Sequence, residues 1–388
     1  MTMKKIIIVN NNMKVGGVQK SLYNLLWTLD GQYDVNLLLF SPVGEYMDKL
    51  PDNVKVLTCD SLFRLLGVSQ AESKEKLTRG ALAALCRIFG RPAVMKLLLA
   101  SQKMLPDHYD CAISFLQNGR KSNFYGGVQE FVLRRIHADR KVAFLHCDYS
   151  RCGANYLENN QLLKEFDHIA ACSEGCKEIF CQTVPELAEK CVTVRNCHRY
   201  DEIRALAGET PVDYDPAACN VVMVSRLAHE KGIERAIAAV KHCKDNGVSV
   251  MLHIVGGGPM RSMLEETAQS AGLSTNVRFY GEQSNPYRYL TNADLFLMTS
   301  FHEAAPMVID EASYLGVPVL TTRTTSSEEM VIRRDCGWVC DNTQQGIDEA
   351  LLNVAKDAAA LREKKAQLQS RSMDNSEAIR QFTALIEG

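Results

Sequence analysis

Short runs of apolar residues alternate with amphipathic stretches along most of the chain. The first run spans residues 4–10, and the stretch at 16–29 that follows it repeats leucines at the spacing of one helical face. Buried strands that alternate with helices in this way are typical of parallel sheets covered by helices on both faces. The pattern therefore predicts an α/β protein.

The predicted strands fall into two series, which a polar segment at residues 199–220 separates. The first series comprises residues 4–10, 35–40, 111–115, 141–146, 168–173 and 191–196, and the second comprises residues 220–225, 248–256, 277–281, 293–300 and 317–322. We therefore predict two Rossmann-like domains with parallel sheets, at residues 1–200 and 201–370, and a carboxy-terminal helix at 371–388 that crosses back to the first domain. Ligands of such sheets bind beyond the carboxyl ends of the strands, so the residues after each strand are the candidates for a site.

One segment, residues 61–105, interrupts this alternation with a pattern that is helical throughout. It contains eight Lys and Arg against two Glu. An apolar stripe lies beside three arginines: Leu82, Leu85, Cys86 and Phe89 beside Arg79, Arg87 and Arg91. A basic amphipathic segment of this kind can lie on an anionic membrane surface. The alternative is an ordinary pair of covering helices whose arginines are solvated.

Composition narrows the class of protein without indicating a partner. Of the 388 residues, 46% are hydrophobic and 23% are charged, which is typical of a soluble globular protein, and the formal net charge of −2 does not indicate nucleic-acid binding. No apolar run approaches the ~18 residues of a membrane span, and the first residues lack the apolar core and cleavage site of a signal peptide. We therefore expect a cytoplasmic protein that binds no nucleic acid.

The fourteen cysteines are expected to be reduced thiols. No CxxC motif occurs, and the CxxxC pairs Cys172–Cys176 and Cys336–Cys340 have no matching His or Cys pair nearby. Asp213 and Asp215 resemble a metal-binding DxD pattern, but they lie beside prolines in the polar segment and follow no predicted strand. We therefore expect a loop there, no essential metal and no bound cofactor.

Two glycine-rich loops follow predicted strands. Gly16 and Gly17 stand where the helix at 16–29 begins, and three glycines at 256–258 precede Pro259 at the expected first position of another helix. Bare backbone N–H groups at a helix N-terminus favour anions such as phosphate, and tight turns are the alternative use of these glycines. Neither loop matches GxxxxGK[ST] or GxGxxG, which disfavours a dinucleotide-dependent dehydrogenase.

Arg226 and Lys231 form a candidate site for a diphosphate. Arg226 follows the predicted strand at 220–225, and Lys231 precedes Gly232 at the start of a helix. Two cations beside a helix N-terminus can hold a diphosphate, because arginine binds it as a fork and lysine as a point charge. Solvated surface cations are the alternative, but a residue directly after a buried strand is poorly placed for that.

A pair of glutamates brackets a proline after the predicted strand at 293–300. Pro306 is acceptable in the first turn of a helix but not deep inside one, so a helix is expected to begin near it. Glu303 then lies in the loop, and Glu311 lies about one and a half turns into the helix. The two carboxylates are displaced along one approach to a ligand, with the helix N-terminus between them. Two solvated glutamates are the alternative.

Taken in order, these motifs resemble retaining glycosyltransferase family 4. The signature is strongest at HEAAPMVIDEASYLGVPV, and six further stretches agree in order: GGVQKSLYNL, FLHCD, VRNCHRYDEI, SRLAHEKGIERAI, IVGGGP and VRFYGEQSNPYRYLTNADLFLMTS. The resemblance spans residues 4–340. The chain departs from the family pattern at Thr299, where the family has proline, and at Ala304 and Ala305 in the loop.

The resemblance implies the GT-B fold, in which two Rossmann-like domains face a central cleft. Residues 1–200 would recognise the acceptor, and residues 201–370 would bind a nucleotide-sugar donor. The residues that it implies for catalysis are Glu303, His146, Arg226 and Lys231. The residues that it implies for donor binding are Gly16, Gly17, Arg226, Lys231, Gly257, Phe279, Tyr280, Glu303, Ala304, Ala305, Pro306, Met307, Val308 and Glu311.

Each role within this set is also implied by the family. Arg226 and Lys231 would neutralise the diphosphate of the donor, and Glu311 would accept hydrogen bonds from the ribose hydroxyls. Glu303 would face the transferred sugar. His146 would lie beside that sugar, and a core histidine bonded to backbone is its alternative interpretation.

The implied reaction transfers a hexose or N-acetylhexosamine, with retention at the anomeric carbon, to a glycan or lipid-linked glycan acceptor. The donor is expected to be UDP-linked, and no enzyme carboxylate need be a nucleophile. The same resemblance implies a role in surface polysaccharide biosynthesis, such as capsule assembly, with peripheral attachment to the inner membrane face left open. Two other functions remain as alternatives: a nucleotide-sugar epimerase or hydrolase of the same fold, and a non-catalytic sugar-nucleotide-binding protein.

Overall fold

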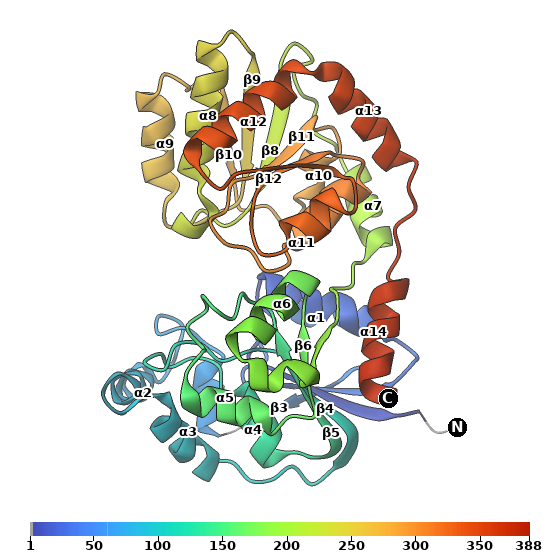
Figure 1. Ribbon diagram of the computed structural model, residues 1–388. Helices are drawn as coiled ribbons and strands as arrows, with labels where there is room; N and C mark the ends of the chain where they lie inside the picture. The colour runs from blue at the N-terminus through green and yellow to red at the C-terminus, as the bar shows by residue number, and fades with distance from the viewer. Residues whose placement is uncertain (1–2, 60) are drawn as a thin grey trace. The chain divides into compact units, whose positions relative to one another are not determined.

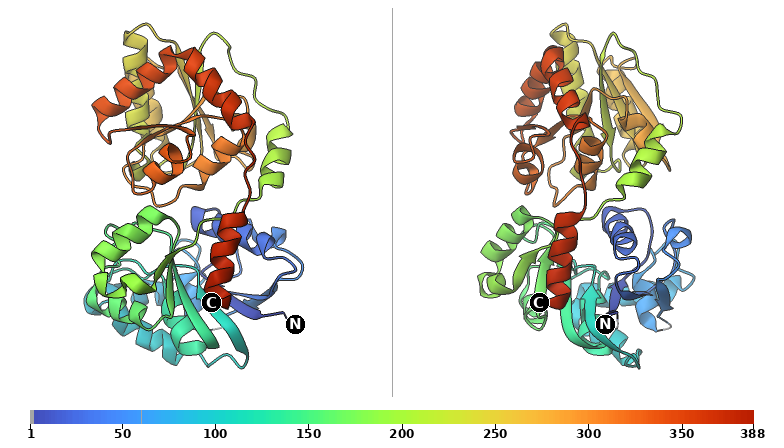
Figure 2. Two further views of the ribbon diagram at one scale, coloured as in Figure 1. Left: turned by 45° about the vertical axis from the view of Figure 1, so that its right-hand side comes forward. Right: turned by 90° about the vertical axis from the view of Figure 1, so that its right-hand side faces the viewer.

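The computed structural model describes residues 3–59 and 61–388. The chain divides into two compact units, the first made of Met1–His198 with Asn375–Gly388 and the second of Arg199–Asp374. In each unit helices cover a single sheet whose strands all run parallel (Figure 1, Figure 2). The α/β class with two parallel sheets, predicted from the sequence, is therefore confirmed.

The sheet of the first unit has seven strands in the order β3-β2-β1-β4-β5-β6-β7. Their bounds are β1 Lys5–Asn10, β2 Asp34–Leu39, β3 Lys55–Thr58, β4 His108–Ser114, β5 His137–Leu145, β6 His168–Ala171 and β7 Cys191–Thr193. Six of these strands correspond to the first predicted series, and β3 was not predicted. The apolar side chains of β1, β2 and β4 are almost completely buried, as the continuous apolar runs predict.

The helices of the first unit are α1 Gly17–Thr28, α2 Lys76–Phe89, α3 Arg91–Ala100, α4 Val128–Arg135, α5 Leu157–Lys164, α6 Glu174–Thr183 and α14 Ser376–Glu387, with the short turns η1 Met47–Lys49, η2 Leu62–Leu66 and η3 Pro185–Lys190. The segment at 61–105 is helical in η2, α2 and α3 but not between residues 66 and 76, so the prediction of an unbroken helical stretch is wrong there. The chain returns to the first unit at α14, which buries Ala378, Phe382 and Leu385 in that unit's core.

The sheet of the second unit has six strands in the order β10-β9-β8-β11-β12-β13. Their bounds are β8 Cys219–Val224, β9 Val250–Val255, β10 Val277–Gly281, β11 Leu295–Met298, β12 Val319–Thr322 and β13 Gly337–Cys340. The helices are α7 Tyr200–Gly208, α8 Ile233–Asp245, α9 Arg261–Ser270, α10 Tyr287–Leu290, α11 Met307–Tyr314, α12 Gln344–Lys356 and α13 Ala358–Gln369, with the short turns η4 His229–Lys231 and η5 Glu328–Ile332.

Three local expectations for the second unit need correction. The polar segment at 199–220 is not all linker, because it contains α7. Strand β13 was not predicted. Pro259 is not the first residue of a helix, since α9 begins two residues later at Arg261.

The strand order of each sheet reverses at one point. In the first unit the reversal lies between β1 and β4, and in the second it lies between β8 and β11. The loops that leave neighbouring strands at such a point diverge to opposite faces of the sheet and open a crevice between them, where ligands bind. The topology therefore singles out the loops after β8 and β11, which contain the predicted residues Arg226, Lys231 and Glu303.

Two arginines of the segment at 61–105 bond to the rest of the unit, Arg91 as a buried side chain and Arg79 as a half-buried one. Arg91 is 1% exposed and donates to both carboxylate oxygens of Glu130, at 2.6 and 2.7 Å, and to Asn118 Oδ1 at 2.6 Å. Arg79 donates through Nε to the backbone oxygens of Leu65 and Val68. The alternative interpretation, covering helices with solvated arginines, therefore does not hold for Arg91 and holds only in part for Arg79, because both side chains connect α2 and α3 to the rest of the unit.

The fourteen cysteines are all free thiols, as expected, and ten of them are buried. Cys172 Sγ and Cys176 Sγ lie 3.9 Å apart without a bond. Burial raises the pKa of the Cys111 thiol to about 12, so this thiol stays protonated at pH 7 and behaves as a small apolar side chain. Within residues 3–59 and 61–388, no group of three or more His, Cys, Asp or Glu is arranged to hold a metal ion.

His253 is a buried titratable group in the second sheet. It lies on β9 with 2% of its surface exposed, and its ring nitrogens contact Tyr280 OH at 3.0 Å and Asn220 Oδ1 at 3.2 Å. Burial, assisted by the charge of Arg278, lowers the pKa of this imidazole to about 4 from the ordinary 6.5. The folded protein therefore keeps His253 neutral at pH values where the unfolded chain would protonate it.

We predict that this histidine makes folding sensitive to acid. Its contribution to the free energy of unfolding is complete above about pH 6.5 and is lost as the pH falls toward 4, because the unfolded state binds the proton first. The free energy of unfolding, measured with urea, should fall between pH 7 and pH 4.5 in the wild type. In His253→Gln this fall should be smaller by about 2 kcal/mol. An equal loss in the two proteins would contradict the assignment.

Candidate active site

The loops after β8 and β11 are joined by an ion pair. Lys231 Nζ lies 2.6 Å from Glu303 Oε1, and Ser300 Oγ donates to the same oxygen at 2.7 Å. The side chain of Glu303 is 11% exposed and that of Lys231 is 25% exposed. A cation and a carboxylate are thus held side by side where the strand order reverses, partly accessible to solvent and therefore to a ligand.

Backbone contacts fix these two loops to each other. Thr299 Oγ1 donates to Gly232 O at 2.7 Å, and Phe301 N donates to Glu230 O at 2.9 Å. Gly232 adopts a left-handed φ of 59°, and a Cβ there would lie 2.4 Å from Thr299 O. Only glycine therefore allows the start of α8 to approach the end of β11 so closely. The hydroxyl of Thr299 is part of this junction.

A polar clamp supports the loop after β11 from behind. Asn342 Nδ2 donates to the backbone oxygens of Ser300 and Phe301, at 3.4 and 3.2 Å, and Asn342 Oδ1 accepts from Arg235 Nη1 at 2.7 Å. The same Arg235 nitrogen donates to Thr299 O at 3.2 Å. Three consecutive carbonyl groups of the loop are therefore held by Arg235 and Asn342, which fixes the backbone that carries Glu303.

Phe301 is held between a ring and a cation. The imidazole of His229 stacks on it at 5.2 Å between centroids and 10° between planes, and the guanidinium of Arg235 lies 4.5 Å from its ring centroid. Stacking and cation–π contacts of this kind restrict the ring and with it the preceding backbone. The loop is thus anchored at both of its ends, since α11 begins after Pro306 as predicted.

Helix α11 presents its first turn beside this loop. Pro306 is its N-cap in an extended conformation, and Met307 and Val308 are its first residues. The first N–H groups of a helix lack partners within the helix, so they are donors for an anion or a sugar hydroxyl. Ala304 and Ala305 are half-buried in the connecting loop, and Glu311, 3% exposed, lies on the inner side of the helix.

Arg226 is held more loosely than Lys231. Its side chain is 68% exposed and pairs with Glu230 four residues on. Burial alone would raise the pKa of Glu230, but a backbone hydrogen bond and the charge of Arg226 hold that pKa below its ordinary value. The guanidinium therefore has room to move toward a ligand, at the cost of an exposed ion pair that contributes little stability.

The glycines at 256–258 support the loop of Arg226. A Cβ on Gly256 would lie 1.9 Å from Ser225 O, and one on Gly258 would lie 2.4 Å from Leu227 O. Gly257 O accepts from Leu227 N at 2.8 Å. Gly256 and Gly258 therefore allow close approach of the backbone, which agrees with the alternative interpretation that these glycines serve a tight turn. Beside Gly257, the atoms nearest to a Cβ would be those of Glu282, at 3.4 Å or more.

Phe279 and Tyr280 lie at the end of β10, an edge strand of the second sheet. Both side chains turn inward and pack against apolar clusters, and Tyr280 OH contacts the ring of His253. Tyr280 O accepts from Gln283 Nε2 at 2.8 Å. Any contact of this strand with a base would therefore come from its backbone, as the family resemblance implies.

The remaining predicted residues belong to the first unit. Gly16 is the extended N-cap of α1, and a Cβ on Gly17 would meet nothing within 4 Å, so packing within the described chain does not demand glycine there. His146 follows β5, its ring lies 4.7 Å from that of Phe115, and its backbone N–H donates to Gln117 Oε1. Burial lowers the pKa of His146 to about 4, against a backbone hydrogen bond at Phe115, so the imidazole is neutral at pH 7.

The structure thus brings Lys231 and Glu303 into direct contact and places Arg226 and the start of α11 on adjoining loops of the same unit. Four contributors to this arrangement were not predicted: Thr299 as a link between loops, Ser300, Arg235 and Asn342. Ser300 and Thr299 could have been found from their position directly after a strand. Asn342 could not, because it follows β13, which the apolar pattern does not reveal.

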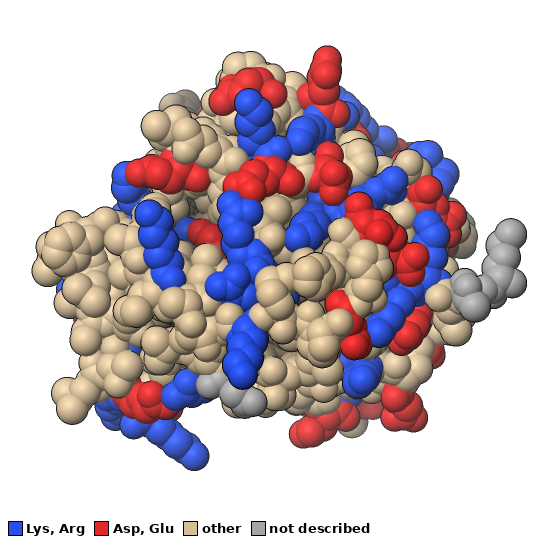
Figure 3. Space-filling view, turned by 90° about the horizontal axis from the view of Figure 1, so that it is seen from below, with Lys and Arg blue, Asp and Glu red and all other residues tan. Residues whose placement is uncertain are grey.

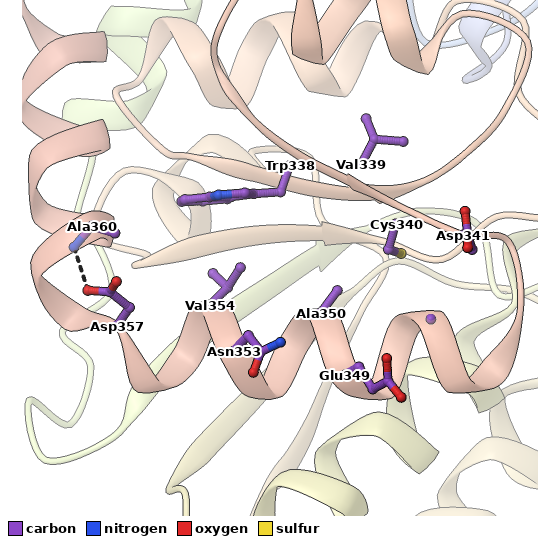
Figure 4. A pocket seen from close by; sticks show the side chains of 11 residues that line it. Trp338, Val339, Cys340, Asp341, Glu349, Ala350, Asn353, Val354, Asp357 and Ala360 are labelled. Atoms are coloured by element: carbon purple, nitrogen blue, oxygen red, sulfur yellow. Dashed lines mark hydrogen bonds between the residues drawn. The ribbon is translucent and has the colours of Figure 1, made fainter.

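A separate groove of about 550 Å³ lies along α12. The ring of Trp338 on β13 lies over this helix, with Val354 and Asn353 below it (Figure 4). None of the residues that line this groove belongs to the loops after β8 or β11. It is therefore distinct from the candidate active site.

Comparison with known proteins agrees with the motifs. Residues 219–372 match the family model described as Glycosyl transferases group 1. The lipopolysaccharide core biosynthesis glycosyltransferase LpsD of Rhizobium meliloti is 32% identical over 164 residues, which are 40% of this chain and 43% of that protein. The 2-deoxystreptamine N-acetyl-D-glucosaminyltransferase of Niallia circulans is 30% identical over 144 residues, 36% of this chain and 37% of that protein. The chain thus spans about two fifths of the length of these curated relatives.

Similarity of fold extends over the whole chain. The crystal structure of Alr3699/HepE from Anabaena in complex with UDP aligns with 99% of this chain and 97% of that one, with a TM-score of 0.64 and 19% identity. At this identity the likeness concerns the fold alone. Together with the two sheets it establishes the GT-B fold, in which one chain contains two Rossmann-like units.

No helix within residues 3–59 and 61–388 is long and apolar enough to cross a membrane.

We predict that Asn342 keeps the loop after β11 rigid. Asn342→Ala leaves the carbonyl groups of Ser300 and Phe301 without this donor, so amide exchange of residues 299–306, followed by mass spectrometry, should accelerate about tenfold or more. The matched control is Asn353→Ala, which removes an exposed amide from α12 in the same unit. Equal exchange in the two variants would contradict a clamp at Asn342.

Proposed function

We propose that the protein is a retaining glycosyltransferase of family 4. It transfers a hexose or N-acetylhexosamine from a nucleotide-sugar, UDP-linked, to a glycan or lipid-linked glycan acceptor in surface polysaccharide biosynthesis. The observation that carries the proposal is the Lys231–Glu303 pair at the strand-order reversal of the second sheet, within the stretch that matches Glycosyl transferases group 1. The names of LpsD and of the N-acetylglucosaminyltransferase from Niallia circulans support the reaction class.

In this proposal the two cations hold the diphosphate of the donor. Lys231 turns from Glu303 toward a phosphate oxygen, and Arg226 exchanges its exposed pair with Glu230 for a forked contact with the same group. The first N–H groups of α11 add partial positive charge. Their combined effect stabilises the negative charge that the leaving diphosphate gains as the glycosidic bond breaks.

Glu303 and Glu311 hold the two sugars of the donor. Once Lys231 turns away, Glu303 keeps its hydrogen bond from Ser300 and has a second oxygen to accept from hydroxyl groups of the transferred sugar. The backbone from Ala304 to Met307 contacts the same sugar. Glu311 accepts from the ribose hydroxyls, and the backbone around Phe279–Gly281 meets the base. The complex of Alr3699/HepE with UDP supports a uridine nucleotide.

The reaction proceeds on one face of the sugar. The bond from the anomeric carbon to the diphosphate oxygen breaks, the acceptor hydroxyl forms the new bond on the same face, and its proton passes to the leaving diphosphate. No carboxylate of the enzyme forms a covalent intermediate, unlike in most retaining glycosidases. A neutral His146 would contribute a hydrogen bond to the sugar rather than a charge, and the mechanism calls for no bound cofactor or metal.

The proposal predicts that Lys231 supplies affinity for the diphosphate. Lys231→Met should weaken binding of UDP, measured by isothermal titration calorimetry, at least about tenfold, because it removes one of two cations at the phosphates. The matched control is Lys241→Met on α8, where the exposed lysine pairs with Asp245. Equal affinity for UDP in both variants, with folding verified by circular dichroism, would contradict the assignment of Lys231 to the diphosphate.

Glu303 should recognise the sugar and not the nucleotide. Glu303→Gln should therefore keep its affinity for UDP within a few-fold but lose most of the rate of sugar transfer, by about a hundredfold or more, measured as UDP released from the true donor in the presence of acceptor. Glu265→Gln on α9, an exposed pair with Arg261, serves as the control. Should Glu303→Gln lose UDP binding and transfer in the same proportion, the carboxylate acts on the phosphate site instead.

A further inference from the structure

Large apolar side chains are exposed on α2 and α3 of the first unit. Leu77 is 90% exposed, Ile88 71%, Phe89 66% and Leu97 49%, and Met104 just beyond α3 is 42% exposed. Single exposed apolar residues are common, but several on two adjoining helices are typical of a surface at which another molecule binds. We call these five residues, with the exposed cations Lys76, Arg87, Lys96 and Lys103, the α2–α3 surface.

The outer face of α2 is apolar along its length. Leu77, Ala81, Ala84 and Ile88 follow the spacing of one helical face, and all four are exposed. The opposite face buries Leu82 and Cys86 in the unit. A helix that covers a soluble protein normally turns charged and polar residues outward, so the fold alone does not explain this face.

This arrangement corrects the stripe expected from the sequence. Of the four residues predicted to form it, Leu82 and Cys86 are buried, Leu85 is half-buried and only Phe89 is exposed. The exposed stripe instead runs through Leu77 and Ile88 on the other side of the helix.

The charged residues of α2, α3 and the residues just beyond α3 are all basic. Between Glu75 and Asp107 the sequence contains no Asp or Glu. Of the cations there, Arg91 is buried and Arg79 is half-buried, and the exposed ones are Lys76, Arg87, Lys96 and Lys103. Figure 3 shows the left-hand part of this face as largely uncharged, with Lys and Arg but few acidic residues.

The surface is held in one shape. Gly90, with a φ of 77°, turns the chain between α2 and α3, and Arg91 N donates to Lys121 O at 2.7 Å. The guanidinium of Arg91 is buried against Glu130 and Asn118. Both helices are thus fixed to the unit, so a partner would meet a preformed surface and would not have to order it.

We propose that the α2–α3 surface binds an anionic lipid bilayer, with Leu77, Ile88 and Phe89 inserted among the lipids and the four exposed cations at the lipid phosphates. The charge supports this choice, because a stretch with exposed cations and no Asp or Glu from residue 76 to residue 106 complements a layer of phosphates. An exposed apolar helix face flanked by lysine and arginine is typical of an interfacial helix, which lies in the plane of the membrane. Binding itself is independent of the proposed function, and it deepens that function by favouring a lipid-linked acceptor at the membrane.

The test is co-sedimentation of the full chain with vesicles at low salt. Wild-type protein should bind vesicles that contain phosphatidylglycerol and not vesicles of phosphatidylcholine alone. Leu77→Ser with Ile88→Ser should lower the partition coefficient at least about tenfold, because burial of each side chain contributes to binding. The matched control is Leu157→Ser with Ile332→Ser, which removes two exposed apolar residues elsewhere and should leave binding unchanged.

A second pair of variants tests the charge. Lys76→Glu with Arg87→Glu should abolish binding to anionic vesicles, and Lys241→Glu on the other unit should not. Failure of the wild type to bind anionic vesicles would overturn the proposal. Binding of the Leu77→Ser, Ile88→Ser variant to vesicles as tightly as the wild type would also overturn it. So would the finding that the wild type is a dimer that does not bind vesicles and that this double variant is a monomer, because the surface would then join two copies of the chain. Binding of UDP, measured on all variants, should be unchanged, so failure here is distinguishable from failure of the proposed function.

Discussion

The ion pair between Lys231 and Glu303 is the contact on which the candidate active site depends. It spans the one point where the strand order of the second sheet reverses, so it joins loops that would otherwise diverge. A partly exposed pair of this kind contributes little to folding stability, because the attraction is offset by desolvation and by loss of side-chain freedom. Its use is to keep a cation and a carboxylate in place until a ligand separates them.

The surroundings of this pair determine its position. Gly232 allows α8 to begin against the end of β11, Thr299 bonds across that junction, and Arg235 with Asn342 holds three successive carbonyl groups. Because these contacts fix the backbone of both loops before a ligand binds, little binding free energy is lost in ordering them. The same arrangement leaves Arg226 free to move, since its contact with Glu230 is exposed.

Elements with strong patterns could be predicted from the sequence. Strands β1 and β8 are continuous apolar runs that the structure buries, and Pro306 predicts the start of α11 correctly. Strands β3 and β13 lie at the edges of their sheets, where half-solvated positions require no apolar run, and so the pattern does not reveal them. The sequence also does not distinguish a solvated arginine from a buried one, because the partners of Arg91, Asn118 and Glu130, lie 27 and 39 residues further along the chain.

The candidate site was predictable only in part, for a similar reason. Residues directly after a strand, such as Lys231 and Glu303, can be expected near a ligand because of the topology of parallel sheets. Asn342 reaches the loop from a segment about forty residues further along the chain, and no local pattern indicates that contact. The exposed stripe on α2 differs from the predicted one because periodicity shows that a helix has two apolar faces but not which of them the fold buries.

The central claim is that the loops after β8 and β11 hold the diphosphate of a nucleotide-sugar. Thermal unfolding of the full chain with UDP, UMP and uridine tests it most directly, because these three ligands differ only in their phosphates. UDP at about 100 times its dissociation constant should raise the free energy of unfolding by about 2.7 kcal/mol, and UMP and uridine at the same concentration should raise it much less. Equal stabilisation by all three ligands, or none by UDP, would contradict the account.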